Sequence, residues 1–319
     1  MSHPMYDHLF ILTITQENPA LANIFLIELC IMGQGKQGQL LEKVPFYLMR
    51  DPIYSHYWKR NAGVDFFIVA SSDHGPCPNF FETTCKTRTK NKKWWTDELS
   101  NVTFLTNEGS YTNGCFRPTI DFTVPTSFYV QNMHTNHRHT SKSPYPNIEI
   151  PKLNNITKRQ HFIFFSGKRS SNVRKQIFRL FKNTTGSFIT EKRLSSSSYL
   201  LIMANSKFCL CVRGQAVWSP RLDEAVFAGC IPVIIADYYE PPYSRLVDYS
   251  SFSVRIYETD IPFLLEILSA IPIERLLMLQ INLGKVRKIF QYSDISALST
   301  GGELTEALIA FTLWQKWKY

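Results

Sequence analysis

Residues 208–256 read FCLCVRGQAVWSPRLDEAVFAGCIPVIIADYYEPPYSRLVDYSSFSVRI, and this stretch decides the fold of the chain. Its beginning, residues 208–212, is apolar and predicts a short buried strand. A helix is expected over residues 221–228. Residues 231–235 are nearly continuous in β-branched side chains, which predicts a second strand covered on both faces. A strand, a helix and a second strand in this order form a βαβ unit, the building block of a parallel sheet.

The two ends of the expected helix carry residues with capping preferences. Ser219 suits the N-cap position, and Pro220 suits the first helical position, where no backbone donor is needed. Gly229 tolerates the left-handed conformation that ends many helices. Polar residues therefore gather where the first strand ends and the helix begins. Open α/β sheets bind their ligands at this edge.

Four side chains at that edge are candidates for ligand binding: Arg213, Ser219, Arg221 and Glu224. Arg221 and Glu224 are three residues apart, so they share one face of the helix. A helix N-terminus with arginines nearby attracts phosphate, and a carboxylate one turn further on accepts hydrogen bonds from sugar hydroxyls. This pattern favours a nucleotide-sugar. The alternative is an Arg–Glu pair that only caps an ordinary Rossmann-like unit.

Short sequence phrases occur in a fixed order along the chain. They are YW at 57–58, Arg60, Gly63, DFF at 65–67, Val69, FFSG at 164–167 with Arg174, FCL at 208–210, SPR at 219–221, EA at 224–225, AGC at 228–230, PVI at 232–234, Asp237, Tyr239, Pro242 and FSV at 252–254. Together they resemble the signature of the exostosin-like glycosyltransferases, glycosyltransferase family 47. The resemblance covers most of residues 54–290 and is densest at 208–256.

The resemblance implies an α/β fold of the glycosyltransferase-B type, with two Rossmann-like domains facing a cleft. It implies an inverting transferase that moves a sugar from a nucleotide-sugar, expected to be a UDP-sugar, to a glycan hydroxyl in polysaccharide or glycoprotein synthesis. No cofactor and no metal are expected. Expected partners are the donor, the glycan acceptor and a related transferase subunit. Members of the family work in the Golgi lumen, so that location is expected here.

The resemblance also implies roles for single residues on the donor side. Glu224 would bind the ribose, and Arg221 and Arg213 would bind the diphosphate, because cations stabilise the charge that develops on a departing diphosphate. Lys168 and Arg169 follow a strand–glycine turn and would assist as a diphosphate cradle or, in the alternative, form an ordinary helix start. The remaining predicted donor-binding residues are Ser219, Gly214 and Asp237.

The predicted acceptor side lies after the apolar run at residues 65–70, in the loop SSDHG at 71–75. An inverting transferase needs a base that takes the proton of the attacking hydroxyl, and Asp73 and His74 are the candidates. The sequence of this loop differs from the motif that is usual in the family, since a serine stands where a histidine is common. A turn-capping Asp73 and a solvated His74 are the alternative.

Length, composition and charge agree with a globular protein that binds anions. The 319 residues suffice for two domains, and 44% hydrophobic with 19% charged residues is a globular composition. The formal net charge of +9 favours nucleotide diphosphates, acidic glycans or nucleic acid. No nucleic-acid-binding motif is present, so a basic nucleic-acid binder is a weak alternative.

The cysteines and the beginning of the chain bear on the compartment. Cys209, Cys211 and Cys230 flank predicted core strands and are expected to be buried thiols. A disulfide among Cys77, Cys85 and Cys115 is expected if the protein is secretory. No stretch is long and apolar enough for a membrane span, although family members usually carry an N-terminal signal-anchor. Either the protein has no such anchor or the sequence lacks its first part, and we expect the second.

The predicted domains are an acceptor-side domain over residues 1–130, a linker over 131–160, a nucleotide-sugar-binding domain over 161–295 and a helical segment over 296–319 that crosses back. Further predicted helices are at 21–32, 171–182, 195–205, 260–268, 272–291 and 302–317, with helical character interrupted by prolines at 40–60. Further predicted strands are at 65–70, 102–105, 121–124 and 161–165. The runner-up function is a non-catalytic member that binds glycan or a partner subunit.

Overall fold

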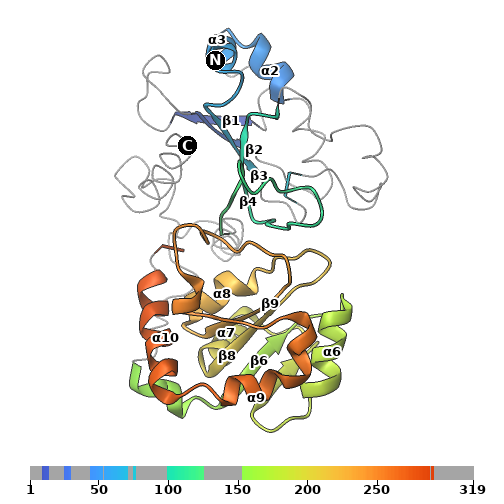
Figure 1. Cartoon of the computed structure of the whole chain (residues 1–319), viewed down its shortest axis with the longest axis vertical. Helices are drawn as coiled ribbons and strands as arrows, with labels where there is room; N and C mark the ends of the chain where they lie inside the picture. The colour runs from blue at the N-terminus through green and yellow to red at the C-terminus, as the bar shows by residue number, and fades with distance from the viewer. Residues whose placement is uncertain are drawn as a thin grey trace. The chain divides into compact units, whose positions relative to one another are not determined.

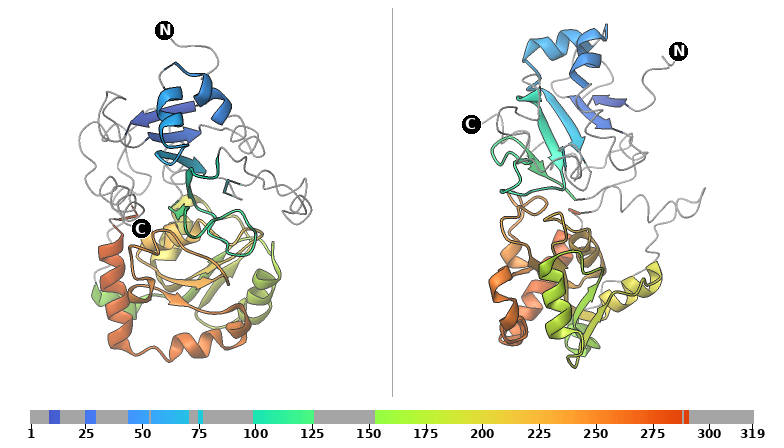
Figure 2. Two further views of the ribbon diagram at one scale, coloured as in Figure 1. Left: turned by 45° about the horizontal axis from the view of Figure 1, so that its top comes forward. Right: turned by 90° about the vertical axis from the view of Figure 1, so that its right-hand side faces the viewer.

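The computed structural model describes residues 9–13, 25–29, 44–52, 54–70, 75–76, 99–125, 153–287 and 289–290. The chain divides into two compact units, shown in Figures 1 and 2. Unit 1 comprises Met1–Val124 together with Tyr238–Tyr243, and unit 2 comprises Pro125–Asp237 and Ser244–Tyr319. Each unit is built on its own five-stranded sheet, and each is described by itself below.

Unit 1 has a mixed sheet in which the strands follow one another in chain order. Its strands are β1 (Leu9–Thr13), β2 (Phe25–Leu29), β3 (Phe66–Ala70), β4 (Thr103–Thr106) and β5 (Phe122–Thr123). The first pair is antiparallel, and the other three pairs are parallel. The strands predicted at 65–70, 102–105 and 121–124 are confirmed as β3, β4 and β5.

A helix had been predicted at residues 21–32, and this prediction is wrong. The residues that the structure describes there form β2, which pairs in parallel with β3, Phe25 opposite Phe66. A short apolar run has no period that separates a strand from a helix, so pairing with a neighbouring strand decides its conformation.

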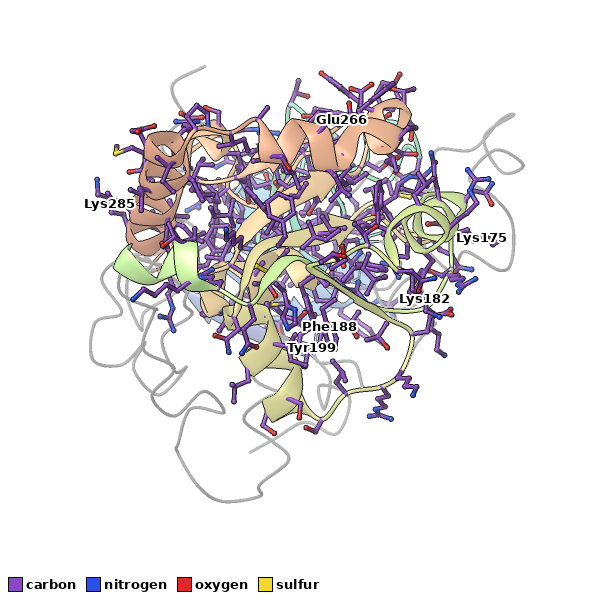
Figure 3. All side chains as sticks on the ribbon, turned by 90° about the horizontal axis from the view of Figure 1, so that it is seen from below. Lys175, Lys182, Phe188, Tyr199, Glu266 and Lys285 are labelled. Carbon is purple, nitrogen blue, oxygen red and sulfur yellow. A yellow bond between two sulfur atoms is a disulfide. The ribbon has the colours of Figure 1, made fainter. Side chains whose placement is uncertain are left out.

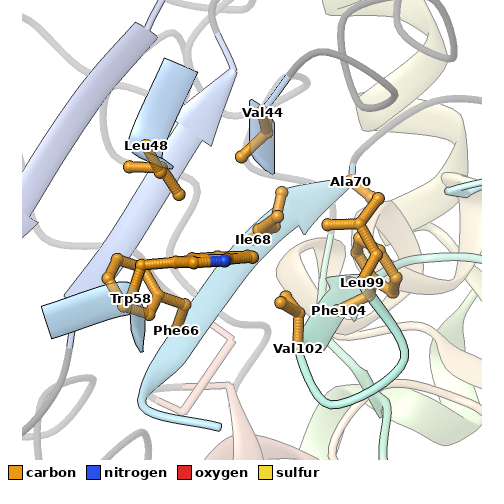
Figure 4. Packing of buried hydrophobic residues seen from close by; sticks show 9 residues of the cluster. All are labelled: Val44, Leu48, Trp58, Phe66, Ile68, Ala70, Leu99, Val102 and Phe104. Carbon is orange, nitrogen blue, oxygen red and sulfur yellow. The ribbon is translucent and has the colours of Figure 1, made fainter. Parts of the chain in front are cut away.

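Two short helices precede β3 in unit 1 and pack against its sheet. They are α2 (Val44–Arg50) and α3 (Tyr54–Arg60), with Pro52 in the break between them, as the prolines of this region predicted. Figure 4 shows the core that they cover. In it, Trp58 lies edge-on to Phe66 with ring centroids 4.9 Å apart, and Phe104 of β4 is fully buried.

Unit 2 has an all-parallel sheet, as expected for consecutive βαβ units. Its strands are β6 (His161–Ser166), β7 (Ser187–Thr190), β8 (Ser206–Val212), β9 (Ile231–Ile235) and β10 (Val254–Arg255), in the order β10-β9-β8-β6-β7. Sequence inspection did not predict β7. The first strand, β6, lies inside the sheet beside the edge strand β7, and β8, β9 and β10 follow in order towards the other edge, so the fold class of two Rossmann-like α/β units is confirmed.

Helices of unit 2 cover the sheet, and α7, α8 and α10 pack directly on its strands (Figures 1 and 3). The α-helices agree in position with the predicted helices, apart from shifts of a few residues at the ends, whereas the short elements at 153–158, inside the predicted linker, and at 249–251 were not predicted. The helical elements are η3 (Leu153–Lys158), α6 (Asn172–Phe181), α7 (Ser196–Ala204), α8 (Arg221–Ala228), η4 (Tyr249–Ser251), η5 (Glu258–Phe263), α9 (Leu264–Ser269) and α10 (Ile273–Val286).

The start of α8 differs by one position from the prediction. Pro220, not Ser219, is the N-cap residue, and it offers no side-chain cap. The Ser219 hydroxyl instead accepts a hydrogen bond from the Arg221 guanidinium at 2.9 Å. At the other end Gly229 has φ 67°, and its N–H donates to the carbonyls of the last turn, so the predicted glycine stop is confirmed.

Two of the three cysteines predicted as buried thiols form a disulfide instead. Cys209 of β8 is bonded to Cys230, which precedes β9, and their Cα atoms lie 5.8 Å apart. β8 and β9 are neighbouring strands, with Cys209 opposite Pro232, and Cys230 stands two residues before that partner, within disulfide reach of Cys209. Cys211 is buried and free, as predicted. Cys115 is disulfide-bonded, while Cys77 and Cys85 lie outside the described residues.

A segment from the second half of the chain completes unit 1. We call Tyr238–Tyr243 the strap. Its backbone bonds to the loop after β4 and to β5: the N–H of Glu240 donates to Gly109 at 2.8 Å, and the N–H of Tyr243 donates to Thr123 at 2.9 Å. Tyr238 and Tyr243 have φ of 57° and 55°, so the strap starts and ends with a left-handed residue.

Other predictions fall on residues that the structure does not describe. They are the linker up to residue 152, the helix at 302–317, and Asp73 and His74. The predicted domain boundaries therefore stay predictions. Among the described residues, no helix is long and apolar enough to cross a membrane.

Candidate functional site

The candidate site lies in unit 2, where β6, β8 and β9 end and where α6 and α8 begin. Parallel strands bring their carboxyl ends to one edge of the sheet, so the residues that follow each strand meet there. Ser166 ends β6, Val212 ends β8 and Ile235 ends β9. Most of the predicted donor-binding residues come from the loops that follow these three strands, or from the helix that begins there.

Arg221, the first residue of α8, is fixed across this edge by backbone and side-chain acceptors. Its Nε donates to the carbonyl of Ser166 at 2.7 Å, and its Nη1 donates to the Ser219 hydroxyl at 2.9 Å. The guanidinium lies over the Phe165 ring, 5.0 Å from the centroid. A Cβ at Gly167 would stand 2.3 Å from Nη2, so this arrangement requires a glycine after β6.

Arg174, in the first turn of α6, places a second guanidinium over the same ring. It lies 5.7 Å from the Phe165 centroid and donates from Nε and Nη2 to the Val212 carbonyl at 3.2 and 3.0 Å. Burial, and to a smaller extent the nearby charge of Arg221, lower the pKa of Arg174 to about 10. A Cβ at Gly214 would stand 3.1 Å from its Nη2.

These two arginines form the most distinctive feature of the site. Within the described part of the chain, neither Arg174 nor Arg221 forms a salt bridge with a carboxylate. Two positive groups held beside each other, next to the N-termini of α6 and α8, form a place that favours an anion with two charges. Arg174 was absent from the predicted site, although the FFSG phrase followed by an arginine had marked it.

Glu224, the predicted ribose ligand, is buried and held from a different helix. The hydroxyl of Tyr199 in α7 donates to its Oε2 at 2.5 Å. Burial raises the pKa of Glu224, while the Tyr199 hydrogen bond and the charge of Arg221 oppose this rise. Tyr199 is missing from the predicted site, because its partner stands 25 positions away and on another helix.

Arg213 has a carboxylate partner that the sequence analysis missed. It donates to both oxygens of Glu258, with 3.0 Å between Nη2 and Oε2. The backbone N–H of Asp237 also donates to Glu258, and the N–H of Glu258 donates to Asp237, each at 3.2 Å. Arg213, Asp237 and Glu258 thus form one network, in which the charge of Arg213 is balanced.

The two cations predicted to assist at the diphosphate lie on the surface of unit 2. Arg169 is paired with Glu191 at 3.0 Å and lies over the Phe178 ring, 4.8 Å from its centroid. Lys168 is exposed. Neither is fixed beside Arg174 and Arg221 by a hydrogen bond in the structure. Within the described ranges, no group of three His, Cys, Asp or Glu residues is arranged to hold a metal ion.

Comparison with known protein families and sequences places this site in context. The exostosin GT47 domain matches residues 14–271. A protein of Arabidopsis thaliana named "Probable glycosyltransferase" is 30% identical over 239 residues, covering 75% of this chain and 41% of the relative. A "Probable beta-1,4-xylosyltransferase" of the same plant is 30% identical over 236 residues, covering 70% and 49%.

A third relative, from Oryza sativa subsp. japonica, is named "Probable glucuronosyltransferase" and is 28% identical over 239 residues, covering 70% of this chain and 50% of the relative. The chain thus spans at most half the length of these three relatives. Among solved structures, a trehalose-6-phosphate synthase covers 98% of this chain and 89% of its own, at 10% identity and a TM-score of 0.38. That likeness is too distant to support a statement about this chain.

Proposed function

Because this chain belongs to the exostosin GT47 family, we propose that it is an inverting glycosyltransferase. It takes a sugar from a UDP-sugar and attaches it to a hydroxyl of a glycan, in polysaccharide or glycoprotein synthesis. Unit 2 binds the nucleotide-sugar at the carboxyl edge of its sheet. The single observation that supports this proposal best is the pair of guanidinium groups of Arg174 and Arg221 over one ring, neither of which forms a salt bridge among the described residues.

The diphosphate of the donor is the anion that this pair suits. Each guanidinium keeps part of its donor fork directed at protein carbonyls or hydroxyls, which fixes its orientation before a ligand arrives. Donors that are already oriented need no rearrangement when charge develops on the leaving diphosphate. The N-termini of α6 and α8 add a favourable potential for the same negative charge. Arg213, Ser219, Gly214, Lys168, Arg169 and Asp237 complete the proposed donor site.

The reaction that we propose is a single displacement. The oxygen of the acceptor hydroxyl forms a bond to the anomeric carbon, and the bond between that carbon and the diphosphate oxygen breaks. The proton of the hydroxyl goes to a general base, for which Asp73 or His74 is proposed, and UDP leaves with the bonding electrons. Glu224 accepts hydrogen bonds from the ribose hydroxyls and thereby orients the nucleotide.

We further propose that the protein works in an oxidising compartment of the secretory pathway, the Golgi lumen. The Cys209–Cys230 disulfide and the disulfide-bonded Cys115 support this location, because structural disulfides are rare in the reducing cytosol. A related transferase subunit is proposed as a partner on the family's pattern alone.

Thermal unfolding with added UDP, GDP and their common sugars tests the proposal. A ligand that binds only the folded state stabilises it, by about 2.7 kcal/mol at a hundred times its Kd. We expect UDP to raise the melting temperature of the wild type and to have little effect on the double variant Arg174→Met, Arg221→Met. Arg179→Met is the matched control, since Arg179 is exposed on the same helix as Arg174.

Two outcomes overturn parts of the proposal. If no nucleotide diphosphate stabilises a well-folded wild type, the donor site is wrong. If UDP binds but purified protein neither hydrolyses nor transfers from any UDP-sugar in the presence of glycan acceptors, the runner-up holds, and the protein is a non-catalytic glycan-binding or partner subunit.

A further inference from the structure

Tyr199 is half-buried and contacts the candidate site through Glu224 of α8. It belongs to α7, and Figure 3 labels it. Its ring lies edge-on to Phe164 of β6, with centroids 5.4 Å apart, and its hydroxyl donates to Oε2 of Glu224 at 2.5 Å. The ring is thus fixed by the sheet, while the hydroxyl is fixed by a carboxylate on α8.

The two carboxylate oxygens of Glu224 have different surroundings. Oε2 carries the hydrogen bond from Tyr199. Oε1 accepts no hydrogen bond from any described residue, and it is not among the buried polar atoms that are sealed from solvent. An oxygen that solvent reaches and that no protein donor engages is available to accept a hydrogen bond from a ligand, whereas Oε2 is already used. Oε1 is therefore the atom that is left for a ligand.

Three titratable groups face Glu224 from the elements packed around it. They are Tyr199 on α7, Arg221 one turn earlier on α8, and Cys211 on β8. Burial raises the pKa of the Glu224 carboxyl, of the Tyr199 hydroxyl and of the Cys211 thiol. Only the Tyr199 hydrogen bond and the charge of Arg221 lower the pKa of Glu224.

We propose that Tyr199 is a positioning residue for donor recognition: its hydroxyl fixes Oε2 of Glu224 and so presents Oε1 to the ribose hydroxyls of the nucleotide. This inference rests on the proposed function, because it assumes that Glu224 faces the ribose of a nucleotide donor. It goes further in assigning ribose selectivity to a side chain that makes no contact with the ligand. Loss of the Tyr199 hydroxyl would leave the ring packing intact and release the carboxylate.

The proposal predicts a selectivity that can be measured without turnover. UDP, 2′-deoxy-UDP and 3′-deoxy-UDP share the base and the diphosphate and differ only in one ribose hydroxyl. A site built to bind a hydroxyl rejects the analogue that lacks it, since its polar groups are then left unpaired. We expect the wild type to bind at least one deoxy analogue about tenfold or more weakly than UDP, as for one lost hydrogen bond to a charged group.

Calorimetric titration of these three nucleotides into wild type, Tyr199→Phe and Glu224→Gln tests the inference. In Tyr199→Phe the ratio of deoxy-UDP to UDP dissociation constants should fall to about threefold or less, close to that of Glu224→Gln. Tyr111→Phe is the matched control: the Tyr111 hydroxyl also donates to a glutamate, Glu240, but in unit 1. Its ratio should equal that of the wild type.

The ratio of deoxy-UDP to UDP dissociation constants should also depend on pH. This pH dependence would not change in Tyr199→Phe if Tyr199 had a purely structural role. The titration of the phosphates cancels in the ratio, so its decline at low pH reports protonation of Glu224. Without the Tyr199 hydroxyl the pKa of Glu224 rises further, and the decline should begin at a higher pH in Tyr199→Phe than in wild type.

The outcomes separate the two proposals. If wild type binds UDP and rejects a deoxy analogue, and Tyr199→Phe rejects it equally well at every pH, Tyr199 does not position Glu224, while the proposed function stands. If the folded wild type binds no UDP, the proposed function fails and takes this inference with it. If Tyr199→Phe and Glu224→Gln lose the selectivity, Tyr111→Phe keeps it, and Tyr199→Phe has the melting temperature of Tyr111→Phe, the inference is supported.

Discussion

Gly167→Ala is expected to disable the candidate anion site without removing a charge. Gly167 follows β6, and the guanidinium of Arg221 lies where the Cβ of an alanine would be. A Cβ there would lie 2.3 Å from Nη2, and the gap to the 3.4 Å of an ordinary contact is 1.1 Å. The backbone of Gly167 is not left-handed, so alanine causes no strain of its own, and Arg221 has to move.

The geometry of Arg221 sets the size of the effect. Its hydrogen bonds to Ser166 and Ser219 are 2.7 and 2.9 Å long, and both cannot survive a displacement of that size. A hydrogen bond to a charged group contributes about 1.5–3 kcal/mol. If Arg221 no longer meets the diphosphate, UDP should bind about 10- to 100-fold more weakly. Gly214→Ala, whose Cβ would lie 3.1 Å from Arg174, should have a smaller effect.

Titration calorimetry with UDP measures this effect, and Gly284→Ala provides the control. Gly284 lies within α10, and a Cβ there would meet nothing within 4 Å. Alanine in a helix interior is about 1 kcal/mol more favourable than glycine, so this variant should be slightly more stable and bind UDP unchanged. A folded Gly167→Ala protein that binds UDP within a factor of about two of wild type would refute the role given to Arg221.

Three further predictions concern stability. Replacing Cys209 and Cys230 together by alanine should cost about 3 kcal/mol, as for other disulfides that close loops of similar length, and adding reductant should lower the urea midpoint of wild type more than that of the variant, which keeps the disulfide of Cys115. Gly109→Ala should cost about 1–3 kcal/mol and speed proteolysis at the strap, because its Cβ would clash with the backbone carbonyl of Glu240. Burial raises the folded pKa of Glu224, so wild type loses stability as pH rises from the unfolded towards the folded pKa. Glu224→Gln has no carboxyl at this position and lacks this loss, so the difference in stability between the variant and wild type should change with pH. A difference that stays constant between about pH 4 and pH 7 would contradict the raised pKa.

Helices and strands were predicted from the sequence where capping residues or a distinctive residue type identify them. Pro220 and Gly229 marked the two ends of α8 to within one residue, and a β-branched run marked β9. The apolar run of β2 has no such marks, and its conformation depends on pairing with β3, which lies far along the chain. β7 was missed because its four residues are neither continuously apolar nor flanked by strong turn signals.

Single residues of the candidate site were predicted where they belong to the βαβ unit itself. Arg221 and Glu224 follow from the spacing within α8. Their partners do not, because a partner is set by the order of strands in the sheet and by which helices lie over it. Tyr199 and the ion pair of Arg213 with Glu258 join positions 25 and 45 residues apart, and no local pattern indicates such pairs.

The strap has a consequence for how this chain can be divided. Unit 1 is not one continuous piece of polypeptide, since six of its residues are encoded after most of unit 2. A fragment that ends at Val124 would leave the carbonyls of Gly109 and Thr123 without the N–H donors of Glu240 and Tyr243. No single cut therefore yields two whole modules. Exchange of one unit between related proteins would have to carry the strap with it, so we expect the two units to be inherited and expressed together.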